Sequence, residues 1–364
     1  MTTLLIAGGG TGGHLVPALV VAGAVRQRQP DWRVVLAGAE RGIEARILPE
    51  RDFPFALLPS EPVYRRQWWR NVRLPAAAYR TVRAAGALLD REQPAVVFGT
   101  GGYASAPVVW LAARRGVPTA VFEADAWPGL ASRLLVRSAR HVYLGTPEAR
   151  ARLTPGKQTL VFETGVPIVP PDSASRAAGR KRFGESSGGP TVLVTGGSQG
   201  SLAINDAVAG WLREGGAAAF QVIWATGHLT WERFKVLHQP PRVHVVPFLD
   251  PISEAYAIAD LAVTRAGAIT LAELAAWGIP SVLIPLPTAA ADHQSRNARA
   301  AQESGAARVL EQGDLTANTL GRTLAEMAEN RTQLEEMRAA ARRRGRPDAA
   351  HRIAGHLEAL TGAV

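Results

Sequence analysis

The sequence predicts an α/β fold in which two Rossmann-like domains each form around a parallel sheet. Short apolar runs typical of buried strands alternate with longer helical stretches along all 364 residues. Residues 166–190 interrupt this alternation, because they are rich in proline, glycine, serine and charge. The pattern then restarts, and both halves begin with an apolar strand, a glycine loop and a helix. A chain of this length is long enough for two domains.

The individual elements follow from this alternation. In the first half, strands are expected at residues 4–7, 33–38, 95–100, 119–123 and 141–145, with helices at 17–29 and 75–92. In the second half, strand-like segments begin at residues 191, 220, 242, 261 and 280. We expect domains at 1–165 and 166–345, and a C-terminal helix within 346–364 that packs back on the first domain.

Composition and charge exclude several classes of protein. The chain has no cysteine, which rules out disulfides and thiolate chemistry and fits a reducing cytoplasm. It has no apolar run of the ~20 residues that span a bilayer, and its first residues do not resemble a signal peptide. The net charge of +10 favours anionic partners, although a basic composition alone also explains it. Because no zinc finger, helix-turn-helix or aromatic RNA-binding pattern is present, we do not expect a nucleic-acid partner.

Three glycine loops each follow an apolar strand, at residues 8–13, 99–107 and 195–201. Glycine lets backbone approach a ligand closely, and a helix N-terminus attracts a phosphate. In an open α/β sheet all three loops lie at the carboxyl ends of strands, where ligands bind. The first loop does not complete the dinucleotide fingerprint, because Glu40 is only a loose candidate for the ribose-binding acid.

His14 follows the first glycine loop directly, at the start of a predicted helix. The helix N-terminus disfavours a protonated imidazole, so a neutral His14 can accept a proton from a hydroxyl. Alternatively, His14 caps the helix or binds a phosphate.

Two further clusters follow strands in the second half. Thr270 and Glu273 lie in the first turns of a helix, where a carboxylate can accept both hydroxyls of a ribose or simply complement the helix dipole. Asp292, His293 and Gln294 begin another helix. Adjacent residues seldom converge on one ion and no third ligand is evident, so we expect no metal.

Five motifs, in order along nearly the whole chain, resemble the MurG family of bacterial lipid I N-acetylglucosaminyltransferases: GGGTGGHLVPAL, GTGGYASAP, GGSQGS, TRAGAITLAEL and DHQSRNA. The resemblance implies a GT-B fold, with parallel sheets facing an interdomain cleft. It implies inverting transfer of GlcNAc from UDP-GlcNAc to the 4-hydroxyl of MurNAc in undecaprenyl-diphospho-MurNAc-pentapeptide (lipid I), giving lipid II for peptidoglycan. No cofactor is implied, and other cell-wall enzymes are possible partners.

The resemblance also implies roles for individual residues. His14 matches the general base, Glu273 the ribose-binding carboxylate, and Leu249 a backbone contact to uracil. The full set implied to contact the donor in the second domain is Ser198, Gln199, Leu249, Ala268, Ile269, Thr270, Glu273 and Gln294. In the first domain, Thr11, Gly12 and Gly13 match the loop close to the donor sugar and the acceptor diphosphate. Thr100, Gly101, Gly102 and Tyr103 match the loop that helps to hold the acceptor diphosphate.

Three positions depart from the family pattern. Phe122 and Asp125 stand where the family has a histidine and an asparagine that contacts GlcNAc, and Val169 stands where an arginine serves the donor. An ionised aspartate accepts but does not donate a hydrogen bond. These departures change the sugar contacts that the resemblance implies and leave the UDP half of the site intact.

A lipid-linked acceptor requires contact with the cytoplasmic face of the cell membrane. The best candidate surface lies in residues 63–89, where arginines surround two tryptophans: Arg65, Arg66, Trp68, Trp69, Arg70 and Arg73. Arginine attracts anionic headgroups and tryptophan favours the interface. The alternative is a solvated basic loop with its tryptophans packed inward.

The residues alone are also compatible with two other classes of function. Another enzyme of the same fold, such as a glycolipid glycosyltransferase or a UDP-GlcNAc epimerase, would share the nucleotide site. A nucleotide-binding protein without catalysis would share it too, although His14 beside a glycine loop favours turnover.

Overall fold

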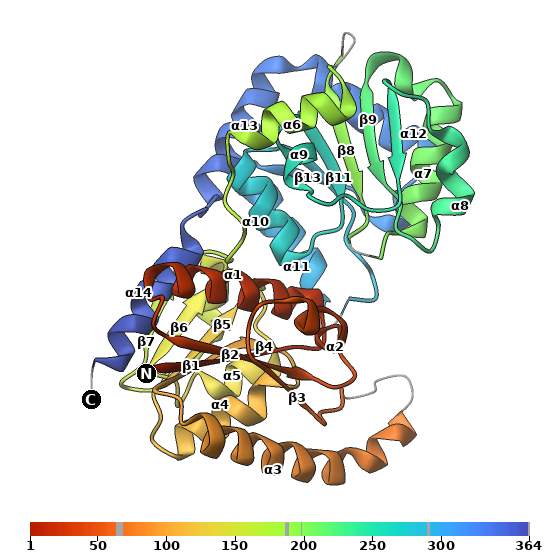
Figure 1. Cartoon of the computed structure of the whole chain (residues 1–364). Helices are drawn as coiled ribbons and strands as arrows, with labels where there is room; N and C mark the ends of the chain where they lie inside the picture. The colour runs from red at the N-terminus through yellow and green to blue at the C-terminus, as the bar shows by residue number, and fades with distance from the viewer. Residues whose placement is uncertain (63–67, 186–188, 198, 290–291, 363–364) are drawn as a thin grey trace. The chain divides into compact units, whose positions relative to one another are not determined.

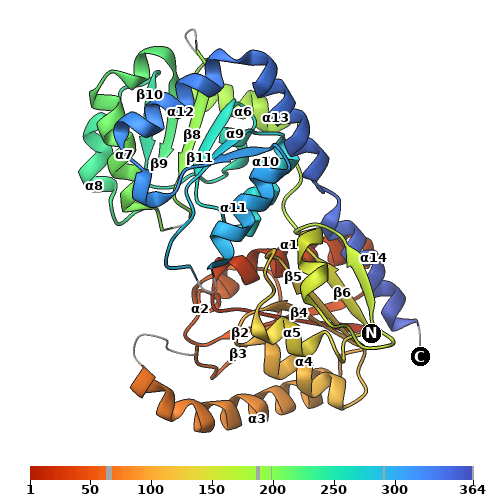
Figure 2. The same cartoon turned by 180° about the vertical axis from the view of Figure 1, so that it is seen from behind.

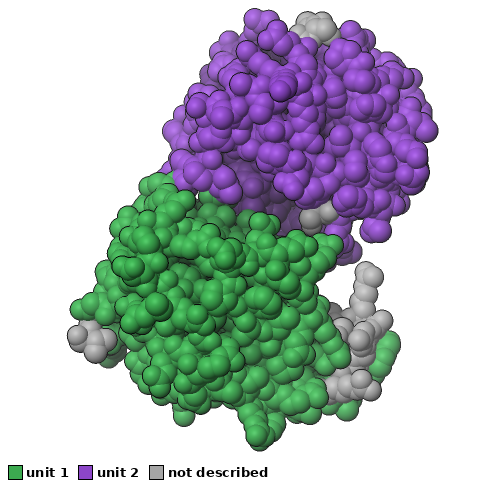
Figure 3. Space-filling view, in the orientation of Figure 1, with its two compact units in different colours: residues 1–168, 348–364 green, residues 169–347 purple. Residues whose placement is uncertain are grey.

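The structure is a computed structural model that describes residues 1–62, 68–185, 189–197, 199–289 and 292–362. The chain forms two compact units, coloured separately in Figure 3. Unit 1 comprises Met1–Ile168 and Asp348–Val364, and unit 2 comprises Val169–Pro347. The sequence placed the corresponding boundaries after residues 165 and 345.

Unit 1 is built on a parallel sheet of seven strands in the order β3-β2-β1-β4-β5-β6-β7. The strands are β1 (Thr3–Gly8), β2 (Arg33–Ala39), β3 (Phe55–Leu58), β4 (Val96–Gly101), β5 (Thr119–Glu123), β6 (His141–Leu144) and β7 (Leu160–Glu163). The central strands are buried on both faces, which explains why they read as continuous apolar runs.

Helices cover both faces of this sheet (Figures 1 and 2). They are α1 (Gly12–Arg28), α2 (Glu44–Ile47), α3 (Leu74–Glu92), α4 (Ser105–Arg114), α5 (Leu130–Leu135) and α14 (Ala349–Thr361), with 3-10 turns η1 (Leu48–Glu50), η2 (Trp68–Arg73) and η3 (Pro147–Arg152). α14 packs along α1, where the Arg28 Nε lies 2.6 Å from the Glu358 Oε1.

Unit 2 is built on a second parallel sheet, of six strands in the order β10-β9-β8-β11-β12-β13. The strands are β8 (Thr191–Thr195), β9 (Gln221–Ala225), β10 (Val243–Val246), β11 (Leu261–Thr264), β12 (Ser281–Leu283) and β13 (Ala307–Val309). The helices are α6 (Ala174–Phe183), α7 (Leu202–Arg213), α8 (Trp231–Phe234), α9 (Ser253–Tyr256), α10 (Ala268–Trp277), α11 (His293–Glu303), α12 (Ala317–Glu329) and α13 (Arg331–Arg344), with 3-10 turns η4 (Gly216–Ala219), η5 (Lys235–Leu237) and η7 (Gln312–Asp314).

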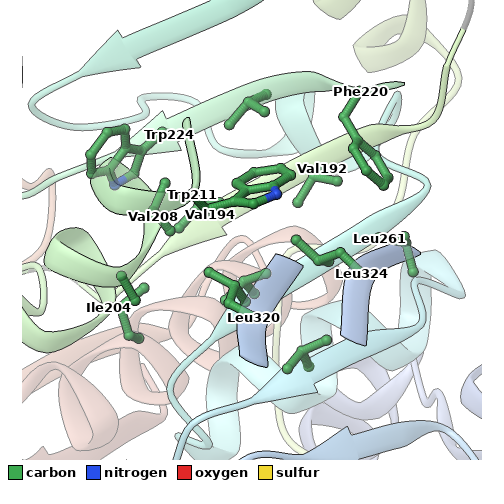
Figure 4. Packing of buried hydrophobic residues seen from close by; sticks show 14 of the residues in the cluster. Val192, Val194, Ile204, Val208, Trp211, Phe220, Trp224, Leu261, Leu320 and Leu324 are labelled. Atoms are coloured by element: carbon green, nitrogen blue, oxygen red, sulfur yellow. The ribbon is translucent and has the colours of Figure 1, made fainter. Parts of the chain in front are cut away.

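The core of unit 2 lies on both faces of its sheet. Along β8, Val192 and Val194 pack with the aromatic side chain of Trp211 on α7 (Figure 4). Leu193, between them, belongs to a second apolar cluster with Phe183. Because successive side chains of a strand point to opposite faces, both layers of helices are held by the same strand.

Three strands were not predicted, namely β3, β7 and β13, and all three lie at an edge of their sheet. Each has at most four residues, and much of each strand is only partly buried. Such short edge strands lack the continuous apolar run that marks a central strand. Among the described residues, no helix is long and apolar enough to cross a membrane.

Candidate active site

Each sheet has one point at which the strand order reverses, between β1 and β4 in unit 1 and between β8 and β11 in unit 2. Ligands of open α/β sheets bind outside the carboxyl ends of the strands at such points. The first two predicted glycine loops follow β1 and β4, and the third follows β8. The strand order therefore brings the predicted residues of each unit to the place where that unit can hold a ligand.

The first two glycine loops pack directly on one another. The backbone N–H of Gly9 donates to the carbonyl of Gly101 over 3.3 Å. Gly102 has a positive φ of 85°, and a Cβ added there would lie 1.8 Å from the Gly9 carbonyl oxygen. A side chain at this position would separate the loops, so glycine is required here.

His14 and Thr100 join the ends of β1 and β4 through two hydrogen bonds. The Nδ1 of His14 lies 3.1 Å from the Thr100 carbonyl, and the Thr100 hydroxyl donates to the His14 carbonyl over 2.8 Å. A carbonyl can only accept, so this contact places the proton of a neutral ring on Nδ1 and leaves Nε2 as the basic nitrogen. The hydroxyl of Thr100, which is buried, is therefore used to position His14. That the loop of Thr100 helps to hold the acceptor diphosphate stays a prediction.

The start of α1 is accessible, because Thr11 and Gly13 are exposed and Gly12 is only partly buried. Its N-cap, Thr11, is extended and makes no side-chain cap bond, so its hydroxyl does not cover the first-turn amides of Gly12 and Gly13. The ring of Tyr103 lies against Gly10, where an added Cβ would be 2.4 Å from its Cε1. Tyr103 thus comes from the second loop to contact the first.

Two buried carboxylates that the sequence analysis did not select hold loops of unit 1. Glu123, at the end of β5, accepts the N–H groups of Asp125 and Gly129, each over 3.0 Å. Burial raises the pKa of Glu123, while a hydrogen bond from Ser132 opposes the rise. Glu44 accepts the N–H of Gly10 over 2.8 Å. The bond between Glu44 and Gly10 joins residues 34 positions apart, and the sequence carries no local pattern that predicts it.

In unit 2, the third loop leads into α7 through a close backbone contact. Gly200 has a positive φ of 76°, and an added Cβ would lie 2.0 Å from the Thr226 carbonyl oxygen. Ser201 caps α7 by accepting the N–H of Ile204. Gln199 is exposed in this loop, and Ser198 lies outside the described residues.

Arg265 ties three segments of unit 2 together and was missed by the sequence analysis. Its guanidinium donates to the Ser201 hydroxyl over 2.7 Å, to the Gln312 amide oxygen over 2.7 Å, and to the carbonyls of Ile284 and Pro285. All these acceptors are neutral, and burial lowers the pKa of Arg265. Among the described residues, the partners that hold this positive charge at the N-cap of α7 are thus neutral hydrogen-bond acceptors.

Glu273 lies on the first turns of α10, as predicted, and is partly buried. The hydroxyl of Tyr256 donates to its Oε2 over 2.9 Å. Burial raises the pKa of Glu273 to about 7, and the bond from Tyr256 acts in the opposite direction. The N-cap of α10 is Gly267, which has no side chain to cover the amides of Ala268, Ile269 and Thr270.

The two remaining predicted residues of unit 2 lie in different segments. Leu249 follows β10 and is buried. Gln294, on α11, accepts the Leu286 N–H at its Oε1 over 3.0 Å. Its amide nitrogen remains as the donor of that side chain. Asp292, the N-cap of α11, has a positive φ of 56°.

The predicted membrane surface is described only in part. Arg65 and Arg66 lie outside the described residues, and Trp68, Arg70 and Arg73 belong to η2, in which their side chains are not described. Trp69 is 58% exposed, which favours the interfacial interpretation over inward packing.

The chain is similar to known proteins in both units. Residues 4–144 match the glycosyltransferase family 28 N-terminal domain, and residues 191–353 match the family 28 C-terminal domain. It is 25% identical to the crystal structure of Acinetobacter baumannii MurG, with a TM-score of 0.77 over 99% of this chain and 100% of that one. The calicheamicin glycosyltransferase CalG4, 17% identical, shares the fold with a TM-score of 0.69 over 100% of this chain and 99% of its own. The fold is therefore that of a GT-B glycosyltransferase.

Curated relatives narrow the class further. The UDP-N-acetylglucosamine--N-acetylmuramyl-(pentapeptide) pyrophosphoryl-undecaprenol N-acetylglucosamine transferase of Carboxydothermus hydrogenoformans is 38% identical over 98% of this chain and 97% of the relative. The protein of the same name from Syntrophotalea carbinolica is 41% identical over 96% of both chains. The chain belongs to this MurG family of N-acetylglucosamine transferases.

Proposed function

We propose that this chain transfers GlcNAc from UDP-GlcNAc to the 4-hydroxyl of MurNAc in lipid I, with inversion at the anomeric carbon, and so makes lipid II. Family membership over nearly the full chain supports the substrates. The observation that carries the chemistry is the pairing of His14 with Thr100, because it presents Nε2 as a base beside two glycine loops.

In this mechanism, the Nε2 of His14 takes the proton of the acceptor hydroxyl as that oxygen attacks the anomeric carbon. The bond from Nδ1 to the Thr100 carbonyl keeps the ring in the required tautomer and orientation. The N-terminus of α1 favours the neutral ring before the reaction. Thr100 is thus a positioning residue, and His14 is the catalytic residue.

The acceptor diphosphate would lie against the paired loops of unit 1. The side chain of Thr11 makes no capping hydrogen bond, so the first-turn amides of Gly12 and Gly13 can donate to the diphosphate oxygens. Gly101, Gly102 and Tyr103 form the other wall of this region. The same first loop would also meet the donor sugar.

Unit 2 would hold the donor. The uncovered amides at the start of α10 line the nucleotide pocket, Leu249 offers its backbone to uracil, and Glu273 accepts from the ribose hydroxyls. The amide nitrogen of Gln294 can donate to the sugar. Charge that develops on the leaving diphosphate would be stabilised by the third loop with Ser198 and Gln199, the α7 N-terminus and Arg265.

Contact with an anionic membrane would be made by the α3–α5 side of unit 1. On η2 and α3, Trp69, Val72 and Tyr79 are 58%, 79% and 68% exposed, close to the exposed arginines 80 and 83. α4 contacts α3, and α5 contacts α4. These two helices add the exposed apolar side chains of Trp110, Leu130 and Leu134. Apolar side chains mixed with arginine suit the interface of a leaflet rich in anionic lipid, here the cytoplasmic face of the cell membrane.

The function is tested by UDP release from UDP-GlcNAc, with and without a short-chain lipid I analogue. We expect release to depend on the analogue and to give a β-1,4-linked disaccharide. His14→Ala should lower the rate by about 10²–10⁴-fold, as loss of a general base does. The control His351→Ala removes an exposed histidine on α14 and should behave as the wild type. Release without acceptor would indicate an epimerase or hydrolase, and binding without turnover on the analogue would indicate another lipid acceptor.

Membrane contact is tested separately by sedimentation with vesicles of phosphatidylglycerol or of phosphatidylcholine. We expect binding to the anionic vesicles only, and weaker binding by a Trp69→Ala, Val72→Ser double variant. A matched double variant of exposed apolar residues in unit 2, Leu229→Ala with Val236→Ser, should bind normally. Equal loss in both variants, or in neither, would rule out the α3–α5 side as the docking surface.

A further inference from the structure

Glu44 is a buried carboxylate that the proposed chemistry does not use. The sequence analysis looked for an acid after the second strand and found Glu40, which is exposed at the end of β2. Glu44, four residues further along the chain and at the start of α2, has 0% of its surface exposed. Glutamate is almost never buried to this extent unless its carboxylate is paired.

The carboxylate accepts backbone N–H groups from two segments. Its Oε1 accepts from Gly10 over 2.8 Å, and its Oε2 accepts from Ala39 over 3.4 Å. Gly10 belongs to the loop after β1, and Ala39 ends β2. Glu44 therefore links the first glycine loop to the neighbouring strand through a side chain that lies 34 residues from Gly10 in the sequence.

Three glycines make room for this side chain. An added Cβ would lie 2.9 Å from the Glu44 Cδ at Gly9, 2.6 Å from its Cβ at Gly38, and 1.8 Å from its Oε2 at Gly42. Contacts below 3.0 Å force a neighbour to move, and here the neighbour is the carboxylate or its stem. The space around Glu44 is thus available only because three surrounding positions lack side chains.

The energetics favour a positioning role over a stabilising ion pair. Burial raises the pKa of Glu44, and the groups that oppose this rise among the described residues are backbone N–H groups, first that of Gly10 and then those of Glu44 itself and Ala39. A buried anion held by amides alone is costly. The carboxylate of Glu44 also lies beside a loop that is expected to bind a diphosphate. Because both groups are anions, the charge of Glu44 does not attract the diphosphate. Glu44 therefore contributes to the site through the backbone geometry that it imposes on the first glycine loop.

Gly10 is the residue on which that geometry acts. It has a positive φ of 102°, its N–H is held by Glu44, and the ring of Tyr103 lies against its Cα. Because Gly10 is held in this way, the direction in which Thr11 to Gly13 enter α1 is fixed. His14 lies in the first turn of α1, so its position is fixed as well.

We propose that Glu44 is a positioning residue for the reaction: by binding the Gly10 N–H, it sets the conformation of the first glycine loop and hence the placement of the first-turn amides and of His14. The proposal rests on the proposed function for the assignment of that loop to the acceptor diphosphate. Glu44 touches neither substrate, and acts through backbone.

Two variants perturb the contact in different ways. Glu44→Gln keeps the shape and one acceptor but turns an amide NH₂ toward one of the two backbone N–H groups. Gly42→Ala keeps the carboxylate but displaces it, since the new Cβ would overlap its Oε2. Glu40→Gln is the matched control, because it removes an exposed acid from the same segment. Each protein is assayed with UDP-GlcNAc and a short-chain lipid I analogue, and hydrogen exchange is measured over residues 9–14.

We expect Glu44→Gln and Gly42→Ala to lower kcat by about ten- to hundred-fold, the usual cost of misplacing a catalytic group by about 1 Å. The Kd of UDP and the melting temperature should stay at the wild-type values, because the proposed nucleotide site lies in unit 2 and the fold is retained. Exchange over residues 9–14 should be faster in both variants. Glu40→Gln should match the wild type in every measurement.

The proposal is overturned if both variants keep the wild-type kcat, or if exchange over residues 9–14 is unchanged. It is also overturned if kcat falls only in proportion to a loss of folded protein, which the melting curves report. Failure of the wild type to turn over lipid I analogue would instead refute the proposed function. Faster exchange in Glu44→Gln and Gly42→Ala would then still establish that Glu44 holds the loop.

Discussion

Tyr256→Phe is expected to shift the pH dependence of UDP binding to higher pH. The substitution removes the hydroxyl that donates to the Glu273 Oε2 over 2.9 Å and keeps the buried ring. In the proposed donor site, Glu273 accepts from the ribose hydroxyls, so it must be ionised to bind them. Among the described residues, Tyr256 is the titratable group whose hydrogen bond acts on the pKa of Glu273, besides the burial that raises it.

The magnitude follows from the hydrogen bond that is lost. A hydrogen bond to a charged group contributes about 1.5–3 kcal/mol, and the lower figure suits a carboxylate that is only partly buried. About 1.4 kcal/mol raises the pKa by about one unit, from about 7 in the wild type to about 8. At pH 7 the ionised fraction of Glu273 then falls from about a half to about a tenth, which weakens UDP binding about five-fold. Well above pH 8 the two proteins should bind UDP equally.

The assay is calorimetric titration with UDP at pH values between 6 and 9. The control is Tyr143→Phe, which removes the hydroxyl of a buried tyrosine in unit 1 and should leave the curve unchanged. Glu273→Gln should remove the part of the pH dependence that has its midpoint at about pH 7 to 8, and leave the part that comes from titration of UDP itself. A midpoint that stays in place in Tyr256→Phe would refute the coupling of Tyr256 to Glu273. A wild-type affinity retained by Glu273→Gln at all pH values would refute the ribose contact itself.

Three further predictions concern other contacts. Arg265→Gln should weaken binding of UDP more than binding of uridine, because Arg265 places a positive charge at the N-cap of α7; equal weakening of both, in parallel titrations, would contradict an electrostatic role toward the diphosphate. Gln294→Glu keeps the acceptor for the Leu286 N–H but loses the amide donor, so KM for UDP-GlcNAc should rise while the Kd of UDP stays constant; an unchanged KM in steady-state assays would exclude the sugar contact. Burial, with a smaller effect of His356, lowers the pKa of His141 to about 4, so the unfolded chain binds the extra proton and stability should fall as the pH drops from about 6.5 to about 4, by up to about 3 kcal/mol. His141→Phe should flatten this dependence in thermal unfolding, and an equally steep curve would show that His141 is not its source.

Much of the fold could be predicted because its signals are local. The central strands of both sheets are buried on both faces and read as uninterrupted apolar runs, and β5 coincides with its predicted range of 119–123. The glycine loops are also local, since a strand, a turn with positive φ and a helix N-terminus succeed one another within about a dozen residues. The edge strands β3, β7 and β13 were missed for the converse reason, because a short strand at an edge needs no continuous apolar sequence.

The order of the motifs determined the class of protein, and the comparisons confirm the GT-B fold and the MurG family. The sequence by itself therefore determined which loops exist, the residue types that they carry and the family to which the chain belongs. It also made His14 a candidate base, because a helix N-terminus favours a neutral imidazole, and this role stays a prediction.

Only the tertiary structure decided how these residues are held. Thr100 reaches His14 across 86 positions of sequence because β4 pairs with β1, and the same pairing makes Nδ1 of His14 the donor. The bonds of Glu44 to Gly10, of Arg265 to Ser201 and of Tyr256 to Glu273 have the same origin. Periodicity reports which face of an element is buried, whereas a contact between elements depends on strand order and register, which arise only when the sheet assembles.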